Sequence, residues 1–169
     1  MSDTTVKGLA QLQAALDSLP AKIEANIMRG ALRAGAKLVL ADAKRSASFA
    51  DRTGALRDSL RITTSLKRGT VSAAVKAGAT AKDKRPFYAH MVEFGTAAHA
   101  ITAGPGKLLP VYGGVKSVHH PGARKHPYLR PALDTQAGAA VGAAAEYIRK
   151  RLATKYGIDV PAPAEEGDE

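Results

Sequence analysis

The chain has 169 residues, of which 45% are hydrophobic and none is Cys or Trp, and its formal net charge is +10. This length fits one domain with a core of its own, while the absence of Cys excludes disulfides, thiolate metal sites and thiol nucleophiles. No apolar run approaches the roughly 18 residues that span a bilayer, and the first residues lack the features of a secretory signal, so we expect no membrane partner and synthesis in a cytoplasm.

Two helices are predicted at the N-terminal end. Leucines recur at helical spacing over residues 8–19, and Pro20 both ends this helix and suits the start of a second one, from Ala21 to about Ser48. The apolar stripe of the second helix is Ile23, Ile27, Ala31, Ala34, Leu38 and Ala41. A neighbouring stripe is basic, with Lys22, Arg29, Arg33, Lys37 and Lys44. Its small residues Gly30, Ala34 and Gly35 predict close approach of another element.

A short turn and a β-hairpin should follow. Thr53 is a candidate N-cap for the turn, and Gly54 gives the backbone freedom. Partial alternation predicts strands over residues 60–66 and 70–77, joined by Lys67-Arg68-Gly69. One face should carry Leu60, Ile62 and Thr64 in the first strand and Val71, Ala73 and Val75 in the second. Residues 78–85 are polar and basic, which suits an exposed connection.

The second half predicts a helical turn, an extended arm and a long helix. The turn begins at Pro86 and ends at Gly95. Residues 99–102 and 107–112 are expected as short strands, and residues 113–126 as a loop. The last helix should run from near Tyr128 to Lys155, with Gly157 as its stop. Its predicted core face is Leu129, Leu133, Ala137, Ala140, Ala144, Ile148 and Leu152.

These elements predict one α+β domain over residues 1–157. We expect a small antiparallel sheet packed by the long N-terminal helix and the C-terminal helix, with a protruding arm at about residues 97–126. Residues 158–169 are acidic and should form a disordered tail. Residues 1–156 hold all 25 basic residues and 10 acidic ones, a formal charge of +15, so the body should attract acidic surfaces or nucleic acid.

The sequence shows no catalytic or metal-binding pattern. His119, His120 and His126 lie among Lys and Arg without a carboxylate, which disfavours a bound cation. No Gly-x-Ser-x-Gly elbow or Walker loop occurs, and Glu93, the one acidic residue in an apolar segment, is more typical of a structural ion pair than of a general base. We therefore expect no enzyme, no cofactor and no metal.

The positive charge of the chain raises the possibility that it binds nucleic acid. The basic stripe, Lys82-Asp83-Lys84-Arg85 and Arg124-Lys125 could contact phosphates. Aromatic residues are few, however, and no helix-turn-helix, zinc-finger or ribonucleoprotein signature is present. A basic, non-specific DNA-binding accessory protein is the alternative to a structural role.

Three segments in this order resemble a known family. They are the Arg-Thr-Gly segment (residues 52–59), the Val-Glu-Phe-Gly-Thr segment (residues 92–96) and the Pro-Tyr-Leu-Arg-Pro-Ala segment (residues 127–134). Together they are similar to the neck or tail-completion proteins of long-tailed bacteriophages and prophages, small virion proteins that act where head meets tail. The likeness covers roughly Leu9 to Tyr156.

The resemblance implies a structural virion protein at the head–tail junction, made in the bacterial host. It implies a hexameric ring, contact with other neck and tail proteins, and non-specific contact with DNA in the channel. Arg52, Thr53, Gly54 and Arg57 would fix a corner between helix and sheet. Glu93, Phe94 and Gly95 would anchor the base of the arm, with Glu93 paired to Arg57 or Arg130. The remaining structural or interface candidates are Leu56, Thr96, His120, Pro121, Gly122, Pro127, Leu129 and Pro131.

Overall fold

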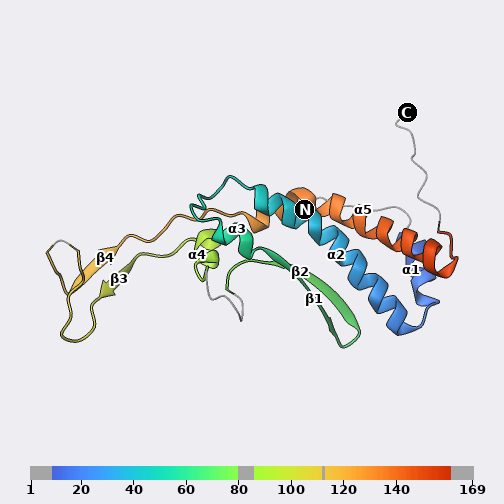
Figure 1. Ribbon diagram of the computed structural model, residues 1–169, viewed down its shortest axis with the longest axis horizontal. Helices are drawn as coiled ribbons and strands as arrows, with labels where there is room; N and C mark the ends of the chain where they lie inside the picture. Colours follow the sequence, from blue (N-terminus) through green and yellow to red (C-terminus); the bar gives the residue numbers. More distant parts are fainter. Residues whose placement is uncertain (1–8, 80–85, 112, 161–169) are drawn as a thin grey trace.

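The computed structural model describes residues 9–79, 86–111 and 113–160. Its elements are α1 (Leu9–Asp17), α2 (Ala21–Arg45), α3 (Ala55–Ser59), β1 (Arg61–Lys67), β2 (Thr70–Lys76), α4 (Ala89–Phe94), β3 (His99–Thr102), β4 (Ser117–His120) and α5 (Leu129–Tyr156). The helices α1, α2 and α5 gather at one end, the β1–β2 hairpin lies beside α2, and the β3–β4 arm extends at the other end (Figure 1). The predicted α+β class is confirmed.

The two long helices form the centre of the body. Helices α2 and α5 make the most extensive contact between any two elements. A side chain at Gly30 would collide with the Tyr147 ring, and a Cβ atom at Gly35 would lie 2.5 Å from the carbonyl oxygen of Ala140. The prediction that small residues let another element approach is therefore confirmed, and that element is α5.

The apolar residues form two clusters rather than one. In the first, α1 closes the far end of the helix pair, and its buried members include Leu12, Leu16, Ile27, Ala31, Ile148 and Leu152. Val160 is also buried in this cluster and Ile158 packs against it. The ordered body thus extends to Val160, three residues into the segment predicted as a tail, because these two apolar side chains fold back onto the core. Residues 161–169 lie outside the described residues.

The predicted core faces of the two long helices are partly wrong. In α2, Leu38 is 37% exposed, while Val39 and Ala43 are buried. In α5, Leu133 is 55% exposed, while Ala132 is buried. The buried residues of α2 recur every four residues, and because a helical turn holds 3.6 residues, the buried row winds around the helix. Its first half belongs to the first cluster, with α1 and α5, and its second half belongs to the second cluster.

The predicted β-hairpin is confirmed. Ile62 pairs with Val75, Thr64 with Ala73 and Leu66 with Val71, so these side chains share one face. Arg68 and Gly69 both have positive φ angles, of 49° and 81°, as a two-residue type I′ turn requires. Both strands contact α2.

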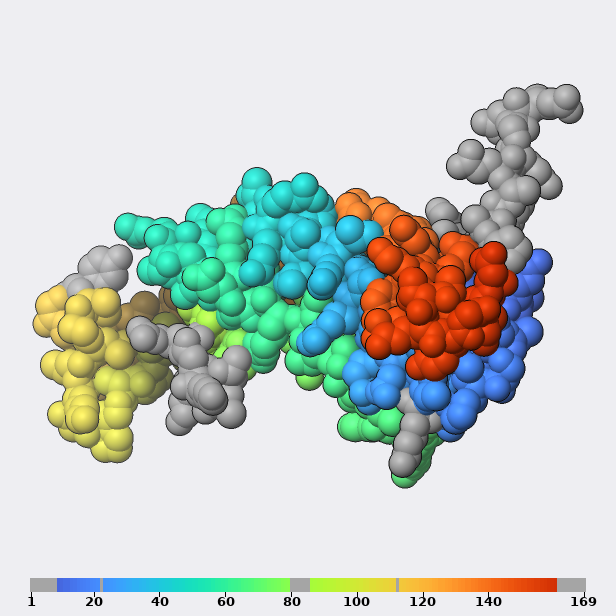
Figure 2. All heavy atoms as spheres, turned by 45° about the vertical axis from the view of Figure 1, so that its right-hand side comes forward, coloured from blue at the N-terminus to red at the C-terminus, as the bar shows by residue number. Residues whose placement is uncertain are grey.

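The arm contains a strand pair, but not the one predicted. Strand β3 falls at residues 99–102 as expected, and its antiparallel partner is β4, which lies inside the predicted loop. Residues 107–111 make only an isolated bridge, between Leu109 and Val115. Pro110 lacks a backbone N–H and cannot extend that pairing. The space-filling view shows the yellow arm at one end of the molecule, away from α1 and α5 (Figure 2).

Candidate assembly site at the base of the arm

A buried glutamate joins α4 to the start of α5. Glu93 is 6% exposed, and its carboxylate accepts hydrogen bonds from the backbone N–H groups of Tyr128 (2.8 Å), Leu129 (3.0 Å) and Arg130 (3.1 Å). These are N–H groups that have no partner within the helix. The carboxylate also lies at the positive end of the helix dipole. Glu93 is therefore the N-terminal cap of a 28-residue helix, supplied from a segment 35 residues away in the sequence.

Glu93 does not form the predicted side-chain ion pair with Arg57 or Arg130. It binds Arg130 through the backbone N–H, while the Arg130 guanidinium carbon lies 5.9 Å from the centre of the exposed Phe94 ring. The backbone amides neutralise the buried charge well enough that no cation is required beside it.

Two glycines let the ends of the arm cross closely. Gly95 has a φ of 74°, and a Cβ atom there would lie 2.7 Å from the carbonyl oxygen of Ala123. Gly122 has a φ of 87°, and a Cβ atom there would collide with the backbone of Thr96 and Ala97. Both positions therefore require Gly for conformation and for space.

Backbone hydrogen bonds fix the outgoing and returning chains together. Thr96 and Ala123 exchange N–H to carbonyl bonds of 3.0 and 3.2 Å, and the Thr96 hydroxyl also accepts from the Ala123 N–H at 2.8 Å. The His126 N–H donates to the Val92 carbonyl at 2.8 Å. The arm consequently leaves the body from a fixed base.

The three segments behind the family resemblance meet at one aromatic pair. Tyr128 is 1% exposed, and its ring centre lies 4.7 Å from that of Phe49. The Arg57 guanidinium carbon lies 4.9 Å from the centre of the Phe49 ring. Burial, reinforced by the nearby Glu93 charge, raises the pKa of Tyr128 to about 12. Its hydroxyl donates to the Ala89 carbonyl at 3.3 Å.

Arg57 fixes the corner at the end of α2. Its Nε donates to the carbonyl of Lys44 at 3.0 Å and an Nη to that of Ser46 at 2.8 Å. The last carbonyls of a helix lack helical partners, and a cation there complements the helix dipole. The backbone N–H of Arg57 donates to Asp51 at 2.8 Å.

The other members of the Arg-Thr-Gly segment have smaller roles than predicted. Gly54, not Thr53, is the N-cap of α3, with a φ of 75°. Thr53 accepts a weak hydrogen bond of 3.4 Å from Ala55. Leu56 is buried at 1% exposure, and Arg52 is exposed.

The remaining predicted residues lie around the same base. His120 pairs with His99 across the β3–β4 ladder, with ring centres 5.1 Å apart, and its Nδ1 accepts the Gly122 N–H at 3.0 Å. Pro121 is exposed and Pro127 is half-buried. Pro131 lies in the first turn of α5, where a missing N–H costs no helical hydrogen bond.

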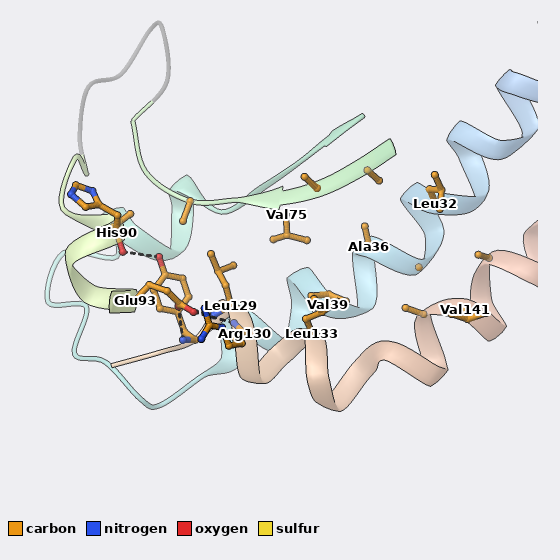
Figure 3. Close-up of a pocket in the computed structure, with 18 of the residues that line it drawn as sticks. Leu32, Ala36, Val39, Val75, His90, Glu93, Leu129, Arg130, Leu133 and Val141 are labelled. Atoms are coloured by element: carbon orange, nitrogen blue, oxygen red, sulfur yellow. Dashed lines mark hydrogen bonds between the residues drawn. The ribbon is translucent and has the colours of Figure 1, made fainter. Parts of the chain in front are cut away.

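An open apolar groove, which no pattern in the sequence predicted, adjoins this base. Its volume is about 780 Å³. Apart from His90, Glu93, Tyr128 and Arg130, its lining side chains are apolar or Gly. The apolar wall consists of Leu32, Gly35, Ala36, Val39, Ala73, Ala74, Val75, Ala77, Ala89, Phe94, Leu129, Leu133, Ala140, Val141 and Ala144. Figure 3 shows Val75 of the hairpin facing Val39 and Leu133 of the two helices. Leu133, which the sequence placed on the core face of the last helix, instead lines this groove and is 55% exposed.

The described parts of the chain contain no group of three or more His, Asp or Glu side chains placed to hold a metal ion. Within those same residues, no helix has the length and apolar character that crossing a bilayer requires. The arrangement offers apolar surface, a rigid base and exposed cations rather than converging reactive groups.

Comparison with known proteins agrees with a structural role. Residues 10–95 match the model of the HK97-gp10-like family, described as "Bacteriophage HK97-gp10, putative tail-component". The match runs from α1 through the Arg-Thr-Gly segment to Gly95 and so includes Glu93. No curated protein and no solved structure matches the chain. The match covers more than half of the sequence, and the chain therefore belongs to the HK97-gp10-like family of structural components of bacteriophage tails.

Proposed function

We propose that this chain forms a homo-oligomeric ring at the head–tail junction, as a neck, tail-completion or tail-terminator protein. The observation that carries the proposal is the arm on its fixed base. Glu93, Gly95 and Gly122 hold both ends of the arm against the body, so the direction of the arm is set before it meets a partner.

The free arm has little to pack against in its own chain. Strands β3 and β4 pack on each other and have no extensive contact with the other described elements. Ile101 (41%), Leu108 (58%) and Val111 (39%) are exposed on the arm. An element with apolar side chains that the fold leaves in solvent suits assembly, because association removes that surface from water.

The charge of the arm limits the partners that it can meet. Residues 94–133 contain no Asp or Glu, whereas Lys107, Lys116, Arg124, Lys125 and Arg130 lie within them. Partner surfaces should therefore be neutral or acidic, including acidic rings of other neck and tail proteins. In the ring, exposed cations of α2 such as Arg33 and Lys37 could face DNA in the channel.

Deletion of residues 102–116 tests the role of the arm in the particle. The shortened chain should fold with the body intact and fail to support head–tail joining, so that a phage carrying it accumulates separate heads and tails. Normal numbers of joined particles would contradict the proposal. A body that unfolds is recognised beforehand from its thermal melting.

The alternative, a basic DNA-binding accessory protein, makes a different prediction. Binding of free duplex by the ring protein should be weak at physiological salt and should weaken further as salt rises. Tight duplex binding at physiological salt by a chain that remains monomeric would favour the alternative.

A further inference from the structure

We infer that the apolar groove between the β1–β2 hairpin, α2 and α5 receives the tip of the arm from a second copy of this chain. The inference rests on the proposed ring and names the contact that would build it. This contact joins the groove and the arm tip, two surfaces that lie too far apart to meet within one chain.

The groove has the character of an unfilled interface. Leu133 is 55% exposed and Val141 38% exposed on its rim, and Phe94, at the end nearest the arm, is 65% exposed. Three large exposed apolar side chains around one apolar groove are typical of a binding surface rather than of a surface that stays in contact with solvent.

The arm tip has matching chemistry. Among the described residues of the arm, Leu108 is the most exposed large apolar one, and it lies between strands β3 and β4, where the chain turns back. The cations nearest to it along the chain are Lys107 and Lys116. Long Lys side chains can leave their ammonium groups in water at the rim while the apolar part is buried. Among the described residues, the groove lining includes one carboxylate, that of Glu93, which already accepts hydrogen bonds from backbone N–H groups.

Self-occupation is excluded by the direction of the arm. The Thr96–Ala123 hydrogen bonds and the close crossing at Gly95 and Gly122 fix where the arm leaves the body. From that base the arm extends away from the β1–β2 hairpin, whose second strand forms one wall of the groove (Figure 1). The tip can therefore reach a groove only on another copy.

A contact between two different surfaces of identical chains is heterologous. Each copy inserts its arm into one neighbour and receives the arm of the other neighbour. The same contact therefore repeats from subunit to subunit until the ring closes. This accounts for an arm and a groove on the same polypeptide and requires no symmetric surface.

Cross-linking tests the pairing directly, since the natural chain has no Cys and an introduced thiol is unique. Leu108→Cys and Leu133→Cys variants, one with a size tag, are mixed and treated with a short flexible bismaleimide. We expect a mixed dimer in several-fold higher yield than from Leu108→Cys with Leu9→Cys, an exposed control on α1. Equal yields from the two mixtures would overturn the inference.

Charge variants separate this contact from the ring itself. Leu108→Glu and Leu133→Glu should each fold, because both positions are exposed, and each should weaken self-association about tenfold or more. Their mixture should give a one-to-one dimer and nothing larger, since only one intact arm and one intact groove remain. Rings that persist in both variants would overturn the groove assignment and leave the proposed ring standing. If wild-type protein forms neither rings nor cross-links, both the proposed ring and the groove contact are overturned. If Leu133→Glu protein still forms rings but no longer supports head–tail joining, the groove binds another virion protein instead of the arm.

Discussion

The carboxylate of Glu93 accepts the backbone N–H of Tyr128 at 2.8 Å, and this bond joins the two ends of the arm to the body. Glu93 lies just before the arm leaves, and Tyr128 lies where the chain returns into α5. One side chain therefore caps a long helix and determines the position of the arm. Its place in the Val-Glu-Phe-Gly-Thr segment is explained by this double role.

Removal of the Glu93 carboxylate should be strongly destabilising. Glu93→Ala leaves three backbone N–H groups near the protein interior without a partner, and we expect a loss of about 3 kcal/mol or more in the free energy of unfolding. Glu93→Gln retains an acceptor and should lose about 1–2 kcal/mol. Urea denaturation measures both, with the exposed Glu146→Gln as a control. A Glu93→Ala protein as stable as that control would contradict the capping role.

Alanine at Gly95 should disturb the base of the arm. The positive φ and the contact with Ala123 both oppose a Cβ atom, at a cost of about 1–3 kcal/mol. Gly104→Ala is the matched control, because a Cβ atom there meets nothing within 4 Å. Faster amide hydrogen exchange at Thr96 and Ala123 in Gly95→Ala, but not in Gly104→Ala, would show that the arm base has loosened. Unchanged exchange in both would mean that the crossing tolerates a side chain.

Tyr128 should make stability fall at alkaline pH. Its pKa is about 10 in the unfolded chain and about 12 in the folded one, so the phenol stays protonated in the folded state while it ionises in the unfolded state. The contribution to stability is complete below pH 10 and is lost as the pH rises from 10 to 12, by up to about 2–3 kcal/mol.

Tyr128→Phe keeps the ring against Phe49 and removes the ionisable group. The difference in unfolding free energy between wild type and Tyr128→Phe should therefore shrink or change sign between pH 9 and 11.5, while Lys ionisation affects both proteins equally. A difference that does not depend on pH would contradict the burial of this phenol.

Arg57 and Arg52 should behave differently although they stand five residues apart in one segment. Arg57→Ala removes two bonds to the last carbonyls of α2 and the contact with Phe49, and we expect a loss of about 1–3 kcal/mol. Arg52→Ala, at an exposed position, should stay within about 0.5 kcal/mol of the wild type. Thermal melting of the two variants at equal salt gives the comparison, and equal losses would contradict the assigned corner.

The sequence predicted the elements whose signals are local. Pro20 and Gly157 mark ends of the long helices, and Arg68-Gly69 marks the hairpin turn, because capping and turn conformations depend on neighbouring residues. Strand β4 was missed because it contains only one apolar residue, Val118, and forms through backbone pairing with β3. The partner of Glu93 was wrongly expected to be a guanidinium, because nothing local to Glu93 shows that the start of α5 lies beside it. Periodicity within one element cannot reveal the groove, because α2, β2, α4 and α5 line it together.

Electron microscopy of the purified chain, with its solution mass measured in parallel, shows whether the arm builds a ring. We expect closed rings with one repeating subunit, and we expect these rings to be lost when residues 102–116 are deleted while the thermal melting of the body is retained. A chain that stays monomeric at high concentration, or rings that form equally well without the arm tip, would contradict the proposal that the arm builds the ring.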